Sequence, residues 1–156
     1  MTFSEATHIH IMGIGGIGVS AIGRLGLHLG KTVSGCDVEM TAITKDLAAK
    51  GAKVVEGHNP GHVEGVNLLV YSPAVPENNF ERMKARELGI TEMSYPEVLG
   101  ELSRQYKTIA VAGTNGKTTT TAMTGLVLEA LGMDPTVIVG SNVKQWDGNF
   151  RAGNSE

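Results

Sequence analysis

Apolar and polar positions along the chain follow two alternating patterns. Short β-branched and apolar runs predict strands, at residues 8–12, 32–36, 53–56, 67–71 and 90–93. Longer segments of helical periodicity predict helices, at residues 17–29, 41–50 and 77–88 and again from Pro96. Strands that alternate with helices are typical of a parallel sheet with helices on its faces. The pattern therefore predicts an α/β fold with a Rossmann-like parallel sheet over residues 1–103.

The first expected strand runs directly into a glycine loop, GIGGIG, at residues 13–18. The spacing of Gly13, Gly15 and Gly18 is the G-x-G-x-x-G of a Rossmann first turn, where backbone N–H groups approach a pyrophosphate. Asp37 closes the second strand, where such folds place an acid that accepts hydrogen bonds from a ribose. The alternative for Asp37 is the N-cap of the next helix.

Two later loops offer polar side chains at the same expected edge of the sheet. His58 follows the third strand and Ser72 follows the fourth. Open α/β sheets bind ligands beyond the carboxyl ends of their strands. His58 is thus a candidate ligand-binding residue, and the alternative is a solvated loop histidine.

A second glycine loop lies in the stretch TIAVAGTNGKTTTT, residues 108–121. Its β-branched start predicts a strand, and the apolar periodicity of residues 122–131 predicts a helix after the loop. Val111 stands where the strict P-loop pattern has a glycine, so the match is to the narrower form GTNGKTT.

The residues of this second loop suit a nucleotide polyphosphate with Mg²⁺. Gly113 and Gly116 let backbone N–H groups converge at the start of a helix, whose dipole favours an anion. Lys117 adds a positive charge, and Thr118 adds a hydroxyl for the metal ion. The alternative is a strand-to-helix turn with a solvated lysine.

Charge and cysteine content narrow the possible partners and compartment. The net charge of the 156 residues is −3, without a basic run that would follow a nucleic-acid backbone, so we expect no nucleic-acid partner. Cys36 is the single cysteine, which excludes an intramolecular disulfide and suits a reducing compartment; we expect it to be a small buried hydrophobe. Glycines interrupt the apolar N-terminal stretch, so we expect neither a signal peptide nor membrane association, and a cytoplasmic protein.

The expected domain boundary lies at residues 103–106, after a full set of strands and helices. Residues 104–156 then open a second α/β domain, with the second glycine loop and one more β-branched run at 136–139. These elements are too few to cover both faces of a sheet. We therefore expect an intact first domain followed by the truncated beginning of a P-loop ATP-binding domain.

The pairing of the two glycine loops resembles the Mur ligase family of peptidoglycan synthesis. The resemblance rests on HIHIMGIGGIGVSAIG, VSGCD, a GH loop, SPAVPENN and GTNGKTTTT, and it extends over essentially the whole chain. It is strongest to the members that attach L-alanine, or a murein tripeptide, to UDP-N-acetylmuramate. Asn115 departs from the histidine that is usual in the alanine-adding members.

This resemblance implies two binding sites and a reaction. The residues that would bind the UDP-sugar are Gly15, Gly16, Ile17, Gly18, Asp37, His58 and Ser72. The residues that would bind ATP are Gly113, Thr114, Asn115, Gly116, Lys117, Thr118 and Thr119. Lys117 and Thr118 would be catalytic, with Mg²⁺ on Thr118. The γ-phosphoryl group would pass to the muramyl carboxylate, and the amine would then attack the acyl phosphate. Because the family's enzymes are longer, we expect this chain to be inactive by itself.

Three other functions fit parts of the sequence. A nicotinamide-dependent oxidoreductase or dinucleotide sensor would use residues 1–103 but leave the second loop without a role. A non-enzymatic nucleotide-binding regulator is the second alternative. Folate-polyglutamate ligases share GTNGK but follow it with Gly-Ser, where this chain has Thr118-Thr119.

Overall fold

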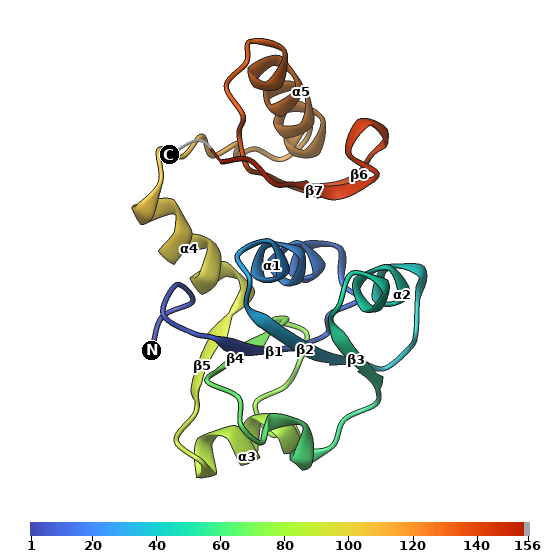
Figure 1. Cartoon of the computed structure of the whole chain (residues 1–156), viewed down its shortest axis with the longest axis vertical. Coiled ribbons are helices and arrows are strands. Elements are labelled where there is room, and N and C mark those ends of the chain that lie inside the picture. The colour runs from blue at the N-terminus through green and yellow to red at the C-terminus, as the bar shows by residue number, and fades with distance from the viewer. Residues whose placement is uncertain (155–156) are drawn as a thin grey trace. The chain divides into compact units, whose positions relative to one another are not determined.

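The chain divides into two compact units, which we describe separately. The structure is a computed structural model that describes residues 1–154 (Figure 1). The first unit is Met1–Leu102, and the second begins at Ser103. The domain boundary expected after residue 103 lies beside this division, and residues 155–156 of the expected second domain lie outside the described part.

A parallel sheet forms the centre of the first unit (Figure 1). Its strands are β1 (His8–Met12), β2 (Thr32–Asp37), β3 (Lys53–Glu56), β4 (Leu68–Tyr71) and β5 (Thr91–Ser94). They are ordered β3-β2-β1-β4-β5, and every neighbouring pair is parallel. The α/β fold predicted for this part of the chain is confirmed.

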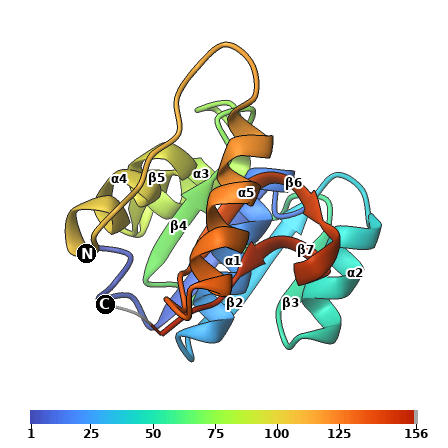
Figure 2. The same ribbon diagram turned by 90° about the horizontal axis from the view of Figure 1, so that it is seen from above.

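Helices cover both faces of this sheet. The helical elements are α1 (Ile17–His28), α2 (Ala42–Ala49), the short 3₁₀ helix η1 (Pro60–Val63), α3 (Phe80–Glu87) and α4 (Tyr95–Gln105). Figure 1 shows α1 and α2 on one face and α3 on the other, and Figure 2 shows α1 beside α2. Parallel strands need such crossovers, because each must return to the same edge before the next begins.

Alternation along the strands sends side chains to two separate cores. On one face, glycines let α1 approach β1 closely: a Cβ at Gly26 would lie 2.8 Å from Ile9 Cδ1, and one at Gly23 would lie 3.5 Å from Ile11 Cδ1. On the other face, Met12 and Cys36 pack in a buried cluster with Ala85 of α3. The sheet is buried on both sides, as expected for parallel strands.

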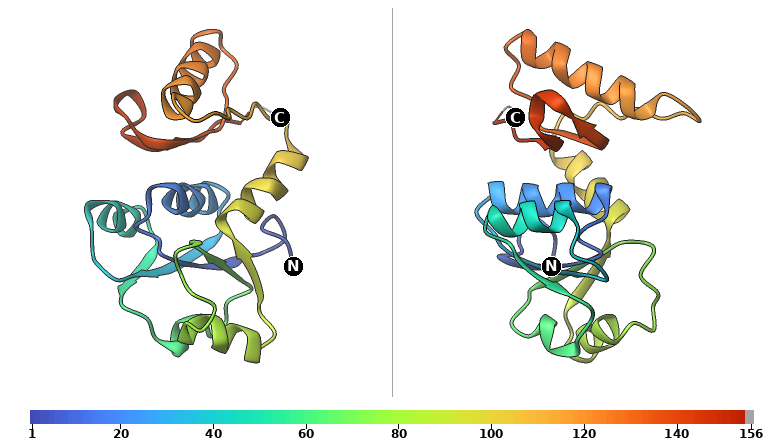
Figure 3. Two further views of the ribbon diagram at one scale, coloured as in Figure 1. Left: turned by 180° about the vertical axis from the view of Figure 1, so that it is seen from behind. Right: turned by 90° about the vertical axis from the view of Figure 1, so that its right-hand side faces the viewer.

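The second unit is built from one long helix and a pair of antiparallel strands. Its elements are α5 (Lys117–Ala130), β6 (Val137–Val143), the 3₁₀ helix η2 (Lys144–Trp146) and β7 (Gly148–Arg151). Figure 3 shows α5 lying along the strand pair. A Cβ at Gly125 would lie 2.7 Å from Trp146 Cη2, so glycine permits this close packing.

One expectation for the second unit was wrong, and one of its strands was not predicted. Residues 108–111 form no strand in the described chain, and Ile109 is exposed. A strand needs a neighbour for its backbone hydrogen bonds, and none of the described strands pairs with this segment. β7 was not predicted, because its residues GNFR lack a β-branched side chain. The expected P-loop α/β arrangement is therefore not shown by residues 103–154.

Candidate functional site

A cavity of about 480 Å³ opens at the carboxyl edge of the sheet in the first unit. It is lined by Gly13, Gly15, Gly16, Asp37, Val38, Glu39, Thr41, His58, Ser72, Ala74, Val75 and Pro76. These residues belong to the loops that follow β1, β2, β3 and β4. Because β1 lies between β2 and β4, the connections leave this edge in opposite directions, which is where open α/β sheets bind ligands.

The glycine loop after β1 forms one wall of the cavity. Gly13 has a φ of 74°, a conformation that favours glycine, and its N–H donates to the Cys36 carbonyl at 2.9 Å. A Cβ at Gly15 would lie 2.9 Å from Asp37 Oδ2 and 3.1 Å from Thr44 Cγ2. Side chains are thus excluded at Gly13 by backbone conformation and at Gly15 by space.

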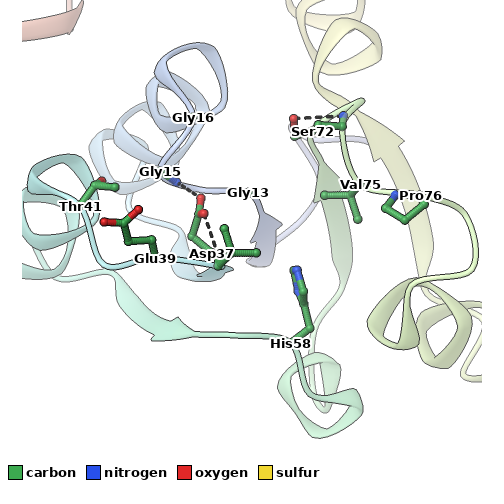
Figure 4. A pocket seen from close by; sticks show the side chains of 12 residues that line it. Gly13, Gly15, Gly16, Asp37, Glu39, Thr41, His58, Ser72, Val75 and Pro76 are labelled. Carbon is green, nitrogen blue, oxygen red and sulfur yellow. Dashed lines mark hydrogen bonds between the residues drawn. The ribbon is translucent and has the colours of Figure 1, made fainter.

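Asp37 holds the glycine loop against the end of β2. Its Oδ2 accepts from the Gly15 N–H at 2.7 Å, and its Oδ1 accepts from the Val38 N–H at 2.8 Å. The alternative role as a helix cap is wrong, because Thr41 is the N-cap of α2 and accepts from the Thr44 N–H. With a backbone donor on each oxygen, Asp37 is a loop anchor at the edge of the cavity (Figure 4).

His58 and Ser72 come from the two loops that face the glycine loop. Figure 4 shows the His58 side chain directed between Gly13 and Val75. Its Nδ1 lies 3.3 Å from Cys36 Sγ, and its side chain is 23% exposed, so it is held by protein as well as open to the cavity. The Ser72 N–H donates to the Met12 carbonyl at 3.0 Å, which continues the β1–β4 pairing into the loop.

Ile17 and Gly18 begin α1 and do not line this cavity. A Cβ at Gly18 would lie 3.0 Å from the Tyr95 ring, so this glycine permits packing between α1 and the start of α4. Burial at this contact raises the pKa of Tyr95. The first turn of α1 has no acidic side chain and no side-chain cap, which leaves its positive dipole end available for an anion.

Several cavity residues were missed by sequence reasoning. Val38, Glu39 and Thr41 lie in the loop between β2 and α2, and Val75 and Pro76 lie in the loop after β4. Val75 and Pro76 belong to the SPAVPENN stretch but were not named as site residues, and no motif marks Val38, Glu39 or Thr41. The available signal was their position after the carboxyl ends of strands that border the switch point.

The second glycine loop lies in the other unit, at the start of α5. Gly113 has a φ of 151° and Gly116, the N-cap of α5, has a φ of 75°. Lys117 Nζ donates to the Gly113 carbonyl at 2.6 Å and to the Thr114 carbonyl at 3.2 Å, so the lysine curls over its own loop. The loop is exposed, and the first turn of α5 has no acidic residue.

Both glycine loops thus lie at the N-terminus of a helix whose first turn lacks acidic side chains. The family model described as "Mur ligase family, catalytic domain" matches residues 8–107. The chain belongs to the Mur ligase family.

Members of the Mur ligase family with curated names are similar over the whole chain. The UDP-N-acetylmuramate–L-alanine ligase of Solibacter usitatus is 46% identical over 155 residues, which are 99% of this chain and 33% of that protein. The corresponding ligase of Desulfotalea psychrophila is 46% identical over 156 residues, 99% of this chain and 34% of that protein. The chain therefore spans about a third of the length of these relatives.

Solved Mur ligase structures share the fold. The UDP-N-acetylmuramate-alanine ligase MurC of Thermotoga maritima matches with a TM-score of 0.89 and 34% identity, over 95% of this chain and 35% of that one. A murein peptide ligase of Psychrobacter arcticus matches with a TM-score of 0.87 and 29% identity, over 96% of this chain and 34% of that one. The predicted membership of this family is confirmed. Among the described residues, no helix combines the length and apolar character needed to cross a bilayer.

Proposed function

We propose that the cavity of the first unit binds UDP-N-acetylmuramate, and that the chain serves an ATP-dependent ligase that joins L-alanine to this nucleotide sugar. The observation that carries the proposal is the cavity itself. It combines a glycine loop, a helix N-terminus and loops from the neighbouring strands at the switch point of the sheet. Similarity to ligases with this substrate in their names supports the choice of ligand.

Each part of the cavity suits one part of the nucleotide sugar. Gly15 and Gly16, with Ile17 and Gly18 in the adjoining first turn of α1, would hold the diphosphate, because the positive end of the helix dipole lies beside this part of the cavity and the first turn carries no acidic side chain. His58 and Ser72, on the opposite loops, would contact the uridine and sugar. Asp37 would act by keeping the loop in place, since both of its oxygens accept backbone N–H groups.

The same feature of Asp37 weighs against a dinucleotide. In Rossmann domains the acid after the second strand accepts hydrogen bonds from ribose hydroxyls. Here its oxygens accept from Gly15 and Val38, so about half of the acceptor capacity of the carboxylate already serves the protein backbone.

The second glycine loop fits a nucleoside triphosphate with Mg²⁺. Positive φ angles at Gly113 and Gly116 turn backbone N–H groups toward the start of α5. Residues 113–119 would hold the phosphates, with Lys117 on the β- and γ-phosphates and Thr118 on the metal ion. Asn115 and Thr119 complete this loop. Lys117 would leave its contacts with the Gly113 and Thr114 carbonyls to do so.

The bound triphosphate would supply a phosphoryl group to activate the lactyl carboxylate of the sugar, after which the amine of L-alanine displaces phosphate. Phosphoryl transfer needs mainly positioning and charge neutralisation, which Lys117 and the loop N–H groups provide. A murein tripeptide is the second candidate acceptor, because murein peptide ligases share this fold closely. ATP and a single buried cysteine suit a cytoplasmic site of action.

Calorimetric titration of the purified chain tests the proposal. We expect UDP-N-acetylmuramate to bind, NADH to give no saturable heat, and UDP alone to bind more weakly than the full sugar nucleotide. Saturable NADH binding without binding of the UDP-sugar would overturn the proposal and favour a dinucleotide domain. Because the chain spans about a third of its relatives, we measure binding and not ligation.

A further inference from the structure

Beneath the cavity, four potential metal ligands meet inside the first unit. His10 comes from β1, Cys36 from β2, His62 from η1 and Glu81 from α3. Their ligand atoms all lie within 4.8 Å of one another. The side chain of His10 is 1% exposed, Glu81 is 0% exposed and Cys36 is 0% exposed, while His62 is 24% exposed. Chain segments from both ends of the unit therefore converge on one buried polar point.

The Glu81 carboxylate lies at the centre of this group. Its Oε2 is 3.1 Å from His10 Nε2 and 3.1 Å from Cys36 Sγ, and its Oε1 is 2.8 Å from His62 Nδ1. Metal–ligand bonds of about 2.0–2.3 Å place the ligand atoms of a tetrahedral zinc site roughly 3.3–3.8 Å apart. To bind one ion, the closest atoms here would separate slightly and the most distant, which lie within 4.8 Å, would draw together.

We propose that His10, Cys36, His62 and Glu81 form a structural zinc site. Two imidazole nitrogens, one thiolate and one carboxylate are all established ligands of Zn²⁺, and four protein ligands make a closed site without an open catalytic position. The mixture of nitrogen, sulfur and oxygen excludes Mg²⁺ and Ca²⁺, which take oxygen ligands. This proposal does not depend on the ligand of the cavity.

The charge balance of the buried group favours a divalent cation. The Glu81 carboxylate is 0% exposed, its Oε1 accepts from the Asn59 N–H and its Oε2 accepts from the Cys36 S–H, so this buried group is surrounded by donors. Among the described residues, no lysine or arginine forms an ion pair with it. A divalent ion would be neutralised by one carboxylate and one thiolate, which limits the cost of burying these charges.

Contacts around the group orient it as metal ligands require. His10 Nδ1 lies 2.9 Å from Ser34 Oγ, a partner that fixes the ring so that Nε2 faces the centre. The backbone N–H of Asn59 donates to Glu81 Oε1 at 2.8 Å and fixes the carboxylate. Ser34 and Asn59 thus occupy the outer positions that accompany metal ligands in proteins.

Zinc binding would exchange a proton for the ion. Without a cation the Cys36 sulfur carries its proton, which it donates to Glu81 Oε2 at 3.1 Å. On binding, the S–H bond is broken, the sulfur pair bonds to Zn²⁺ and the proton passes to solvent. No oxidation or reduction is involved.

Cobalt substitution provides a direct test. The tag-free chain is stripped with a chelator and titrated with Co²⁺, and the ion is then displaced by Zn²⁺. We expect a single cobalt ion per chain, visible absorption bands of tetrahedral cobalt and a sulfur-to-cobalt charge-transfer band in the near ultraviolet. Since Cys36 is the single cysteine, that last band reports this sulfur alone.

Variants separate these ligands from other histidines. Cys36→Ser should abolish the charge-transfer band, and His62→Gln should weaken binding by at least about 100-fold, because loss of an outer-shell partner alone costs about 10–100-fold. Ser34→Ala removes the outer-shell partner of His10 and should weaken cobalt binding by about 10–100-fold. His28→Gln, at the exposed end of α1, is the matched control and should bind as the parent does.

The unaltered chain alone can overturn the proposal, whatever the variants do. If folded protein at saturating cobalt shows no charge-transfer band, the sulfur is not a ligand and the site is not as proposed. Equal cobalt affinity in the parent and in folded His62→Gln would also contradict it. Either result would leave Glu81 held by its hydrogen-bond contacts with His10, Cys36, His62 and the Asn59 N–H alone.

Discussion

The carboxylate of Asp37 and the backbone of Gly15 are joined by a 2.7 Å hydrogen bond that ties the end of β2 to the loop after β1. The bond also explains why position 15 is glycine, because a Cβ there would lie 2.9 Å from the same carboxylate oxygen. The residue that resembles a ribose acceptor is therefore part of the scaffold of the cavity.

Asp37→Ala should destabilise the first unit and weaken ligand binding. A hydrogen bond to a charged group contributes about 1.5–3 kcal/mol, and the loop would lose the acceptor of the Gly15 N–H. We expect a loss of unfolding free energy of this size in urea and at least about tenfold weaker UDP-N-acetylmuramate binding. Unchanged stability in urea would contradict the anchoring role.

Gly15→Ala should displace the loop, and Gly100→Ala provides a matched control. The added methyl at position 15 would lie within 3.1 Å of both Asp37 and Thr44, whereas a Cβ at position 100 would have no heavy atom within 4 Å. Overpacking costs about 1–3 kcal/mol, while alanine for glycine inside helix α4 should add about 0.5–1 kcal/mol. Thermal unfolding and calorimetry of both variants test whether Gly15→Ala lowers the stability and Gly100→Ala raises it.

The start of α4 should make stability depend on pH through Glu97. Glu97 Oε2 accepts from the Ser94 hydroxyl and from the Ser94 N–H, each at 2.6 Å, and the side-chain bond is the main cause of the lowered pKa of Glu97. Folding therefore favours the ionised form of Glu97. Its contribution to the free energy of unfolding is complete above pH 4.5, the ordinary pKa, and is lost as the pH falls through the lowered pKa of the folded state.

Urea unfolding at neutral pH and at several acidic pH values measures this contribution. Glu97→Gln should flatten the acid side of the stability profile, and Ser94→Ala should cost about 1 kcal/mol through loss of the cap. Glu64→Gln, at an exposed acid outside α4, is the control. If the free energy of unfolding falls with acidic pH equally in Glu97→Gln and in the parent, the contribution assigned to Glu97 is contradicted.

Lys117→Ala should weaken ATP binding and leave UDP-sugar binding unchanged, because Lys117 belongs to the second unit and the cavity to the first. Loss of a charge-assisted bond of about 1.5–3 kcal/mol predicts roughly 10- to 100-fold weaker Mg-ATP binding by calorimetry. Lys107→Ala removes another exposed lysine from the same unit and should change neither affinity. Equal ATP affinity in both variants would contradict the phosphate-binding role.

The local sequence was sufficient to predict the strands of the first unit to within one residue at each end. The strands at 8–12 and 53–56 were predicted with the bounds that the structure has, and the other strands differ by one residue at either end. β-branched runs and glycine stops encode such elements in neighbouring residues. The same reasoning failed at 108–111, because strand formation there depends on a partner strand and not on local propensity.

Reasoning from the sequence predicted only part of the candidate site. Gly15, Gly16, Asp37, His58 and Ser72 were all placed at the carboxyl edge, and all line the cavity. Ile17 and Gly18 do not line it, and the packing of Gly18 against Tyr95 had no signal in the motif. Motif spacing describes a loop, but it does not state which of its atoms face a ligand.

The sequence by itself determined the alternation of strands and helices and the two glycine loops, because each is encoded by neighbouring residues, and the family, because its motifs can be recognised along the chain without the fold. Only the tertiary structure decided which distant side chains meet. His10 and Glu81 are 71 positions apart, yet their side chains lie 3.1 Å apart. They meet because the order β3-β2-β1-β4-β5 places β1 beside β2 and β4, with α3 on one face. Strand order depends on packing of the whole unit, and no local pattern specifies it.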